Sequence, residues 1–157
     1  MFRLLLIASL LLWVPAAQAQ QTRKPPYWAS IAASRALMRT GPGKEYPATW
    51  EYRREDLPIR VVEIYKNWRR IRDPGGTVGW MQVNLLSDTR TAMVTGTEIQ
   101  PLHEKPDGSS AIRFHAQPGV VGRISDCGPN WCRFDAKGRR GYIGIGALYG
   151  LDPGESL

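Results

Sequence analysis

The sequence has few residues that carry catalytic chemistry, and it has no long apolar segment outside its first residues. It contains 2 Cys and 2 His in 157 residues. Beyond Val14, no apolar run approaches the roughly 20 residues that a membrane-spanning helix needs. No long window beyond that point shows a regular helical stripe of apolar residues. These absences argue against a helical protein and against a protein that spans a membrane repeatedly.

The N-terminal segment has the features of a cleaved secretory signal. Arg3 supplies a positive start, residues 4–14 are apolar apart from Ser9, and Ala-Gln-Ala at 17–19 is a small-x-small cleavage site. The apolar run is about eleven residues long, which is short for a membrane anchor, the alternative reading. We expect residues 1–19 to be a signal peptide cleaved between Ala19 and Gln20, with export across the inner membrane to the periplasm and no transmembrane span after processing.

The chain is basic. Without Arg3 it holds 20 basic and 14 acidic residues, a net charge of +6. Such a balance favours association with anionic polymers in general, without naming one. The expected export disfavours nucleic acid as a partner, although the charge alone would permit it.

Two stretches of the chain repeat one pattern. Residues 67–71 and 130–134 each combine Asn-Trp with an Arg and a large apolar residue, and Gly79-Trp80 or Gly141-Tyr142 follows. The offset is 63 residues at the Trp and 62 residues at the Gly. A recurrence of this length indicates two copies of one small domain.

Within each copy, short runs of β-branched and aromatic residues alternate with turns rich in Gly and Pro. This pattern predicts small all-β barrels. One helical turn is expected at 83–86, and a linker at 87–91. The expected strands are 36–39, 49–52, 57–65, 68–72 and 77–82 in the first copy, and 98–103, 112–115, 120–127, 131–134 and 140–145 in the second.

The residues of the repeat resemble the bacterial SH3-like (SH3b) domain family. Trp-Arg-x-apolar, a Gly-containing turn and then Gly-Trp or Gly-Tyr are similar to the closing hairpin of that family. Residues 37–43 and 46–50 resemble its first strand and long loop. The match is close over 34–86 and looser over 94–148. The resemblance implies a non-catalytic module of the cell envelope that recognises cell-wall peptides or protein segments through loops and an aromatic-lined groove.

We therefore expect an all-β fold with two tandem SH3-like β-barrels after the cleaved signal peptide. The expected parts are an extended leader at 20–28, a first domain at 29–87, a second domain at 92–150 and a loosely held tail at 151–157. Domains of about 60 residues bury only about 60% of their unfolded surface. The two copies should therefore pack against each other or need extra stabilisation.

The two cysteines flank a short hairpin. In an exported chain, Cys127 and Cys132 most economically form a disulfide, and closing this loop should add about 2 kcal/mol. Two free thiols are one alternative. A second is a Cys2His2 zinc site with His103 and His115, but neither His belongs to the close pair that zinc usually uses. We expect no metal and no cofactor.

No sequence pattern typical of catalysis is present. Gly43-Lys44 lacks the spacing of a phosphate-binding loop, and there is no Gly-x-Ser-x-Gly motif. A Cys–His hydrolase, of the kind often fused to bacterial SH3-like modules, needs a free thiolate and a domain to hold it. Two barrels account for the expected mature chain, so we predict that the protein is not an enzyme, with a hydrolase as the less favoured alternative.

A basic and aromatic surface remains as the candidate site. Trp68, Arg70 and Arg72 alternate along one expected strand and so share a face. Guanidinium groups suit carboxylates and phosphates, and aromatic rings suit sugar faces and extended peptides. Peptidoglycan or an envelope protein is the expected partner, and a protein–protein adaptor without cell-wall affinity is the alternative. The competing reading is that the aromatic residues are core and the arginines a solvated face. The candidate ligand-binding residues are Trp68, Arg70, Arg72, Trp80, Arg53 and Tyr52.

Overall fold

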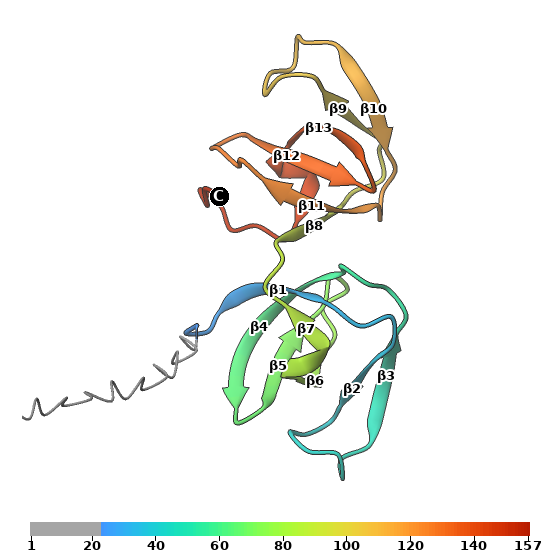
Figure 1. Ribbon diagram of the computed structural model, residues 1–157, viewed down its shortest axis with the longest axis vertical. Helices are drawn as coiled ribbons and strands as arrows, with labels where there is room; N and C mark the ends of the chain where they lie inside the picture. The colour runs from blue at the N-terminus through green and yellow to red at the C-terminus, as the bar shows by residue number, and fades with distance from the viewer. Residues whose placement is uncertain (1–22) are drawn as a thin grey trace, which may run out of the picture.

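The computed structural model describes residues 23–157, which form two seven-stranded β-sheets, each folded into a small barrel (Figure 1). The signal peptide expected at 1–19, its cleavage site at Ala19 and Gln20, and the start of the leader lie outside the described residues. The strands of the first barrel are β1 (Tyr27–Ile31), β2 (Ala36–Arg39), β3 (Ala48–Tyr52), β4 (Pro58–Tyr65), β5 (Trp68–Arg72), β6 (Val78–Gln82) and β7 (Leu86–Ser87). Those of the second barrel are β8 (Thr91–Val94), β9 (Gln100–His103), β10 (Ile112–Ala116), β11 (Val121–Ser125), β12 (Trp131–Ala136), β13 (Arg139–Gly144) and β14 (Leu148–Tyr149).

The two sheets have the same topology. The strand order is β3-β2-β6-β5-β4-β1-β7 in the first and β10-β9-β13-β12-β11-β8-β14 in the second, so each strand of one has a counterpart seven strands later. The prediction of an all-β chain with two tandem barrels is therefore confirmed. Between residues 23 and 157 the helices are two single turns, η1 (Val83–Leu85) and η2 (Ile145–Ala147), and neither is long or apolar enough to cross a membrane.

Alternation along the strands builds each core. In β5, Ile71 is fully buried whereas Arg70 and Arg72 on either side are exposed. In β12, Phe134 is fully buried in the same way. Because successive side chains of a strand point to opposite faces, one face of each hairpin fills the barrel and the other meets solvent.

The repeated Gly-aromatic step has a steric cause. A Cβ atom on Gly141 would lie 2.8 Å from Leu102 Cβ and 3.0 Å from the His103 carbonyl oxygen. At Gly79 it would lie 2.5 Å from Met38 Cγ. In both barrels the glycine faces the core where a neighbouring strand crosses closely, and the following aromatic residue faces outward.

The expected disulfide between Cys127 and Cys132 is present, with the two Cα atoms 4.1 Å apart. It consumes both thiols of the chain, so the Cys2His2 zinc alternative is wrong. Within the described residues, no group of three or more His, Cys, Asp and Glu side chains is arranged to hold a metal ion.

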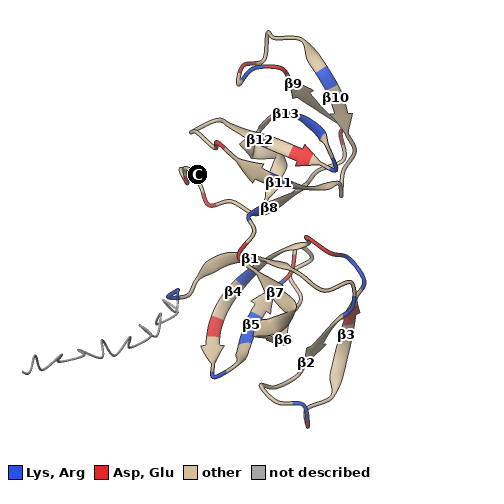
Figure 2. Cartoon of the chain, in the orientation of Figure 1, with Lys and Arg blue, Asp and Glu red and all other residues tan. Residues whose placement is uncertain are grey.

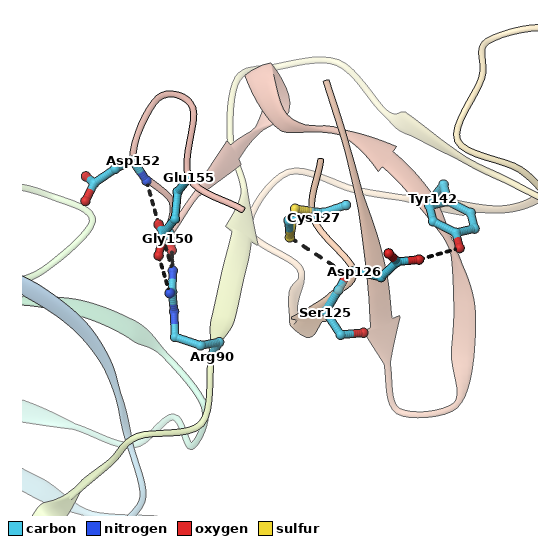
Figure 3. Close-up of a disulfide and its surroundings, with 9 residues drawn as sticks. Arg90, Ser125, Asp126, Cys127, Tyr142, Gly150, Asp152 and Glu155 are labelled. Atoms are coloured by element: carbon cyan, nitrogen blue, oxygen red, sulfur yellow. Dashed lines mark hydrogen bonds and ion pairs between the residues drawn. A yellow bond between two sulfur atoms is a disulfide. The ribbon is translucent and has the colours of Figure 1, made fainter. Parts of the chain in front are cut away.

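The tail at 151–157 is not loosely held, contrary to the expectation from sequence. Leu157 and Cys127 exchange two backbone hydrogen bonds, each 3.2 Å long. Upstream, Asp152 pairs with Arg60 of the first barrel. Glu155 pairs with Arg90 between the barrels (Figure 3). These contacts tie the tail to both barrels and to the link that joins them.

The two barrels pack against each other. Met93 and Val121 of the second barrel pack against the buried core of the first. The rings of Trp28 and Tyr149 meet edge to face, with centroids 4.9 Å apart. The Arg60 guanidinium lies 4.7 Å from the centroid of the Trp28 ring. A small domain gains buried apolar surface in this way, as expected for units of this size.

Candidate binding groove

Two depressions on the outer surface of the first barrel have Trp68 in common. One depression, of about 280 Å³, is lined by Arg35, Leu37, Arg39, Lys44, Trp68, Gln82 and Leu85. A second, of about 330 Å³, is lined by Pro42, Glu45, Tyr46, Tyr65, Lys66, Asn67 and Trp68. Trp68 lines both depressions, and we refer to the two together as the groove.

The loop between β2 and β3 forms one bank of this groove. Arg39 Nη1 donates a hydrogen bond to the Tyr46 carbonyl at 2.7 Å, and the Thr40 N–H donates to the Pro47 carbonyl at 3.1 Å. A side chain on Gly41 would overlap the Tyr46 ring. Glycine is therefore required at position 41 for this ring to lie against the loop, where it remains 42% exposed.

The charges that face the groove are mostly positive. Arg35 and Arg53 both donate to Glu51, through Nε at 2.6 Å and 3.0 Å, and they hold the pKa of this carboxyl below its ordinary value. Lys44 is exposed and, among residues 23–157, belongs to no ion pair. Together with Arg39, Lys44 supplies cations beside the aromatic side chain of Trp68, a combination suited to extended ligands that carry carboxylates.

Four of the six residues proposed from sequence share one face of the barrel. Arg70 lies directly opposite Trp80 in the β5–β6 pair, and Arg72 lies opposite Val78. Trp68 is on the same face, because it is two residues from Arg70 along β5. Arg70 Nη1 is 3.3 Å from a Glu63 carboxylate oxygen, so its charge is already partly neutralised.

The other two residues lie elsewhere. Tyr52 is only 6% exposed and belongs to the core, where its hydroxyl donates to Asp73 Oδ2 at 2.9 Å. Burial, followed by this bond to Asp73, raises the pKa of Tyr52 well above its ordinary value. Arg53 is exposed but bound to Glu51. Neither side chain lines the groove. Of the six residues proposed from sequence, only Trp68 lines it.

Sequence reasoning missed most of the groove. Leu37 and Arg39 alternate with the buried Ala36 and Met38, and this alternation would have placed them on the outer face. Lys44 and Tyr46 lie in a loop whose path depends on Gly41, and no periodic pattern marks such a path.

The second barrel has different residues and contacts at the positions that correspond to Arg39 and Trp68. His103 occupies the place of Arg39, since each lies opposite the outward aromatic residue of its barrel, Tyr142 or Trp80. His103 is only 6% exposed, and its ring meets Trp131 edge to face with centroids 5.4 Å apart. Its Nδ1 lies 3.0 Å from the Ser110 carbonyl oxygen. The indole of Trp131 is thus packed against His103, whereas Trp68 lines the groove.

Comparison with known proteins agrees with this architecture. The family model described as bacterial SH3 domain matches residues 32–88 and again residues 96–150. None of the curated proteins matches the sequence. Bacterial SH3 domains indicate a module that binds cell-wall or protein partners.

Two solved structures are similar to the chain. NlpC2 from Trichomonas vaginalis is 13% identical with a TM-score of 0.36, over 82% of this chain and 49% of that one. NlpC1 from the same organism is 15% identical with a TM-score of 0.35, over 89% and 50%. The chain spans about half the length of each. On the strength of the two family matches and the two barrels that they cover, the chain belongs to the bacterial SH3 domain family, with two copies in tandem.

Proposed function

We propose that the protein is an exported, non-catalytic binding module of the cell envelope, and that the first-barrel groove binds an extended ligand bearing carboxylates. The peptide stems of peptidoglycan have this chemistry. The observation that carries the proposal is that Trp68, Arg39 and Lys44 line the same depression, because an aromatic side chain beside cations suits a chain that alternates apolar and anionic groups.

Two further observations support the non-catalytic and exported parts of the proposal. Both cysteines are bonded to each other, so neither is available as a thiolate nucleophile. Disulfides of this kind persist in oxidising compartments such as the periplasm.

Retention of the purified protein on isolated peptidoglycan sacculi, measured over a series of salt concentrations, tests the proposal. We expect retention that falls as salt rises, because exposed charges are screened. Lys44→Glu should weaken it about tenfold, since it places a like charge beside the ligand carboxylates. Lys105→Glu makes the same change in charge on an exposed loop of the second barrel and should leave retention unchanged.

The opposite results are as informative. If no protein is retained even at low salt, the cell-wall ligand is wrong. A single envelope protein cross-linked through the groove would then favour the adaptor alternative. Equal losses in the two lysine variants would mean that net charge, and not the groove, holds the protein on the sacculus.

A further inference from the structure

Apart from the groove, a cleft of about 640 Å³ lies between the barrels. A second hollow of about 370 Å³ adjoins it, and Arg123 and Asp135 line both. Three more arginines line this second hollow: Arg90, Arg133 and Arg140. Figure 2 shows that basic and acidic residues are both distributed over the two barrels.

Strand register places these side chains on one face of the second barrel. Arg123 lies opposite Asp135 in the β11–β12 pair, and Asp135 lies opposite Arg140 in the β12–β13 pair. Ser125 lies opposite Arg133. Directly opposed residues on one face are about 5 Å apart at Cβ, and diagonal neighbours remain within reach of long side chains. The guanidinium groups of Arg123, Arg133 and Arg140 can therefore contact one ligand.

Some of the charges in this cluster are already neutralised. Arg140 Nε donates to Asp135 Oδ2 at 2.6 Å. Arg90 Nη2 donates to the Gly150 carbonyl at 2.9 Å and to Glu155 at 3.1 Å, and its Nε is buried without a hydrogen-bond partner among residues 23–157. The next carboxylate, Asp126, accepts a hydrogen bond from the Tyr142 hydroxyl at 2.9 Å (Figure 3).

Arg123 and Arg133 are the two arginines lining this hollow that form no ion pair in the described chain. Both are exposed. The cluster thus has a surplus of two cations beside a hollow that solvent can enter.

The first barrel shows what the second lacks. The offset of 63 residues at the Trp equates Arg133 with Arg70. Arg70 lies opposite Glu63 and forms an ion pair with it, whereas Arg133 lies opposite Ser125. Where one copy carries an internal counter-charge for its outward arginine, the other carries a small neutral residue. At this pair of positions the second barrel therefore lacks the counter-charge that the first barrel has, whereas at the next outward position of the same strand it carries Asp135 in place of Arg72.

We infer that Arg123, Arg133 and Arg140 form a binding site for a phosphate-bearing ligand, which we call the junction arginine site. A phosphate group presents several oxygens in a tetrahedral arrangement and can accept guanidinium forks from different directions, whereas a carboxylate offers two oxygens in one plane. Three arginines that approach from three neighbouring strands match the first geometry. This site lies apart from the groove around Trp68, and it takes a different class of ligand.

Titration of the purified protein with inorganic tripolyphosphate at about 0.15 M salt tests this inference, with the shifts of backbone and arginine side-chain N–H signals followed by NMR. We expect saturable shifts centred on positions 123, 133 and 140. Ser125→Glu restores the carboxylate that the first barrel has, so it should pair with Arg133 and weaken binding about tenfold or more. Arg133→Gln should have a similar effect, because it removes one charge-assisted contact.

Arg70→Gln is the matched control, since it removes the corresponding arginine of the first barrel. It should leave tripolyphosphate binding unchanged. All of these positions are on the surface, and unchanged near-ultraviolet circular dichroism will verify the fold. No saturable shift, or equal losses in Arg133→Gln and Arg70→Gln, would overturn the inference.

The source of the phosphate is distinguished by a second arm. Vesicles of phosphatidylglycerol, compared with vesicles of phosphatidylcholine, present phosphates on a lipid surface. Sedimentation with the first and not the second, lost in Ser125→Glu, would identify a lipid headgroup. Binding of tripolyphosphate without sedimentation would identify a soluble phosphate ligand. Failure of Lys44→Glu to affect sacculus binding would bear on the groove alone, because Lys44 is not part of this site.

Discussion

Gly79 and Gly141 explain why the repeat pairs a glycine with an aromatic residue. Each glycine faces the core of its barrel where another strand approaches, and the side-chain-free position is the reason that the strands can come so close. The atoms near Gly141 include the backbone of β9, which cannot move aside as a flexible side chain can. The motif therefore reports on packing and not on ligand binding.

Gly141→Ala should destabilise the protein by about 1–3 kcal/mol, the usual cost of overpacking a core. Gly144→Ala, three residues further along β13, is the control, because a Cβ atom there would meet nothing within 4 Å. Its effect should be small. Urea unfolding followed by fluorescence gives both free energies, and equal losses would show that loss of glycine flexibility, and not crowding, sets the cost.

The candidate site was only partly predictable at this scale. Period-two alternation correctly placed Trp68, Arg70 and Arg72 on one outer face, because Ile71 between them belongs to the core. The same reasoning could not predict that Tyr52 is buried. Its ring packs in the core, and its hydroxyl is accommodated there because it donates a hydrogen bond to Asp73. Lys44 escaped notice because loop geometry, and not periodicity, brings it to the groove.

Among the secondary-structure elements, the central hairpins were predicted closely and the first strand of each barrel was not. The expected strand at 68–72 matches β5, and that at 36–39 matches β2. In contrast, β1 overlaps the expected leader, and β8 begins in the expected linker. These two strands carry no shared motif. They are defined by antiparallel pairing with β4 and β11, which lie about 30 residues further along the chain, and such distant pairing leaves little local signal.

The disulfide loop and the tail form one local unit. Because Leu157 pairs with the backbone of Cys127, loosening of the loop should release the end of the tail. Replacing both cysteines with alanine should cost about 2 kcal/mol, the chain-entropy estimate for so short a loop. Hydrogen exchange at the Leu157 amide should become much faster, while exchange in β5 of the first barrel stays unchanged. An unaltered Leu157 amide would mean that the ion pairs of Asp152 and Glu155 hold the tail without help from the disulfide loop.

On the scale of the whole molecule, the ion pair between Arg90 and Glu155 holds the tail against the link between the barrels. The two side chains are 18% and 23% exposed, so this pair is more protected from solvent than most surface ion pairs. The hydrogen bond from Arg90 lowers the pKa of Glu155 below its ordinary value. A carboxyl group with a lower pKa in the folded state stabilises that state above its unfolded pKa, and this contribution is lost as the pH falls.

We therefore expect the stability of the protein to decline as the pH falls below about 4.3, the ordinary pKa of a glutamic acid, in part through Glu155. Glu155→Gln should remove that part, so the difference in unfolding free energy between neutral and acid pH becomes smaller. Glu98→Gln, at an exposed position without an ion pair in the described chain, is the control and should keep the wild-type difference. Identical pH profiles for Glu155→Gln and the unaltered protein would contradict this assignment.

The packing of Met93 and Val121 onto the first barrel limits how independent the two copies are. Tandem repeats are commonly treated as independent domains that can be separated, reordered or extended without loss of stability. If a protease cut the link and the barrels separated, the first barrel would lose the apolar contacts that Met93 and Val121 supply. The two barrels are better regarded as one evolutionary unit, because substitutions in the packed surface of one barrel are limited by the shape of the other.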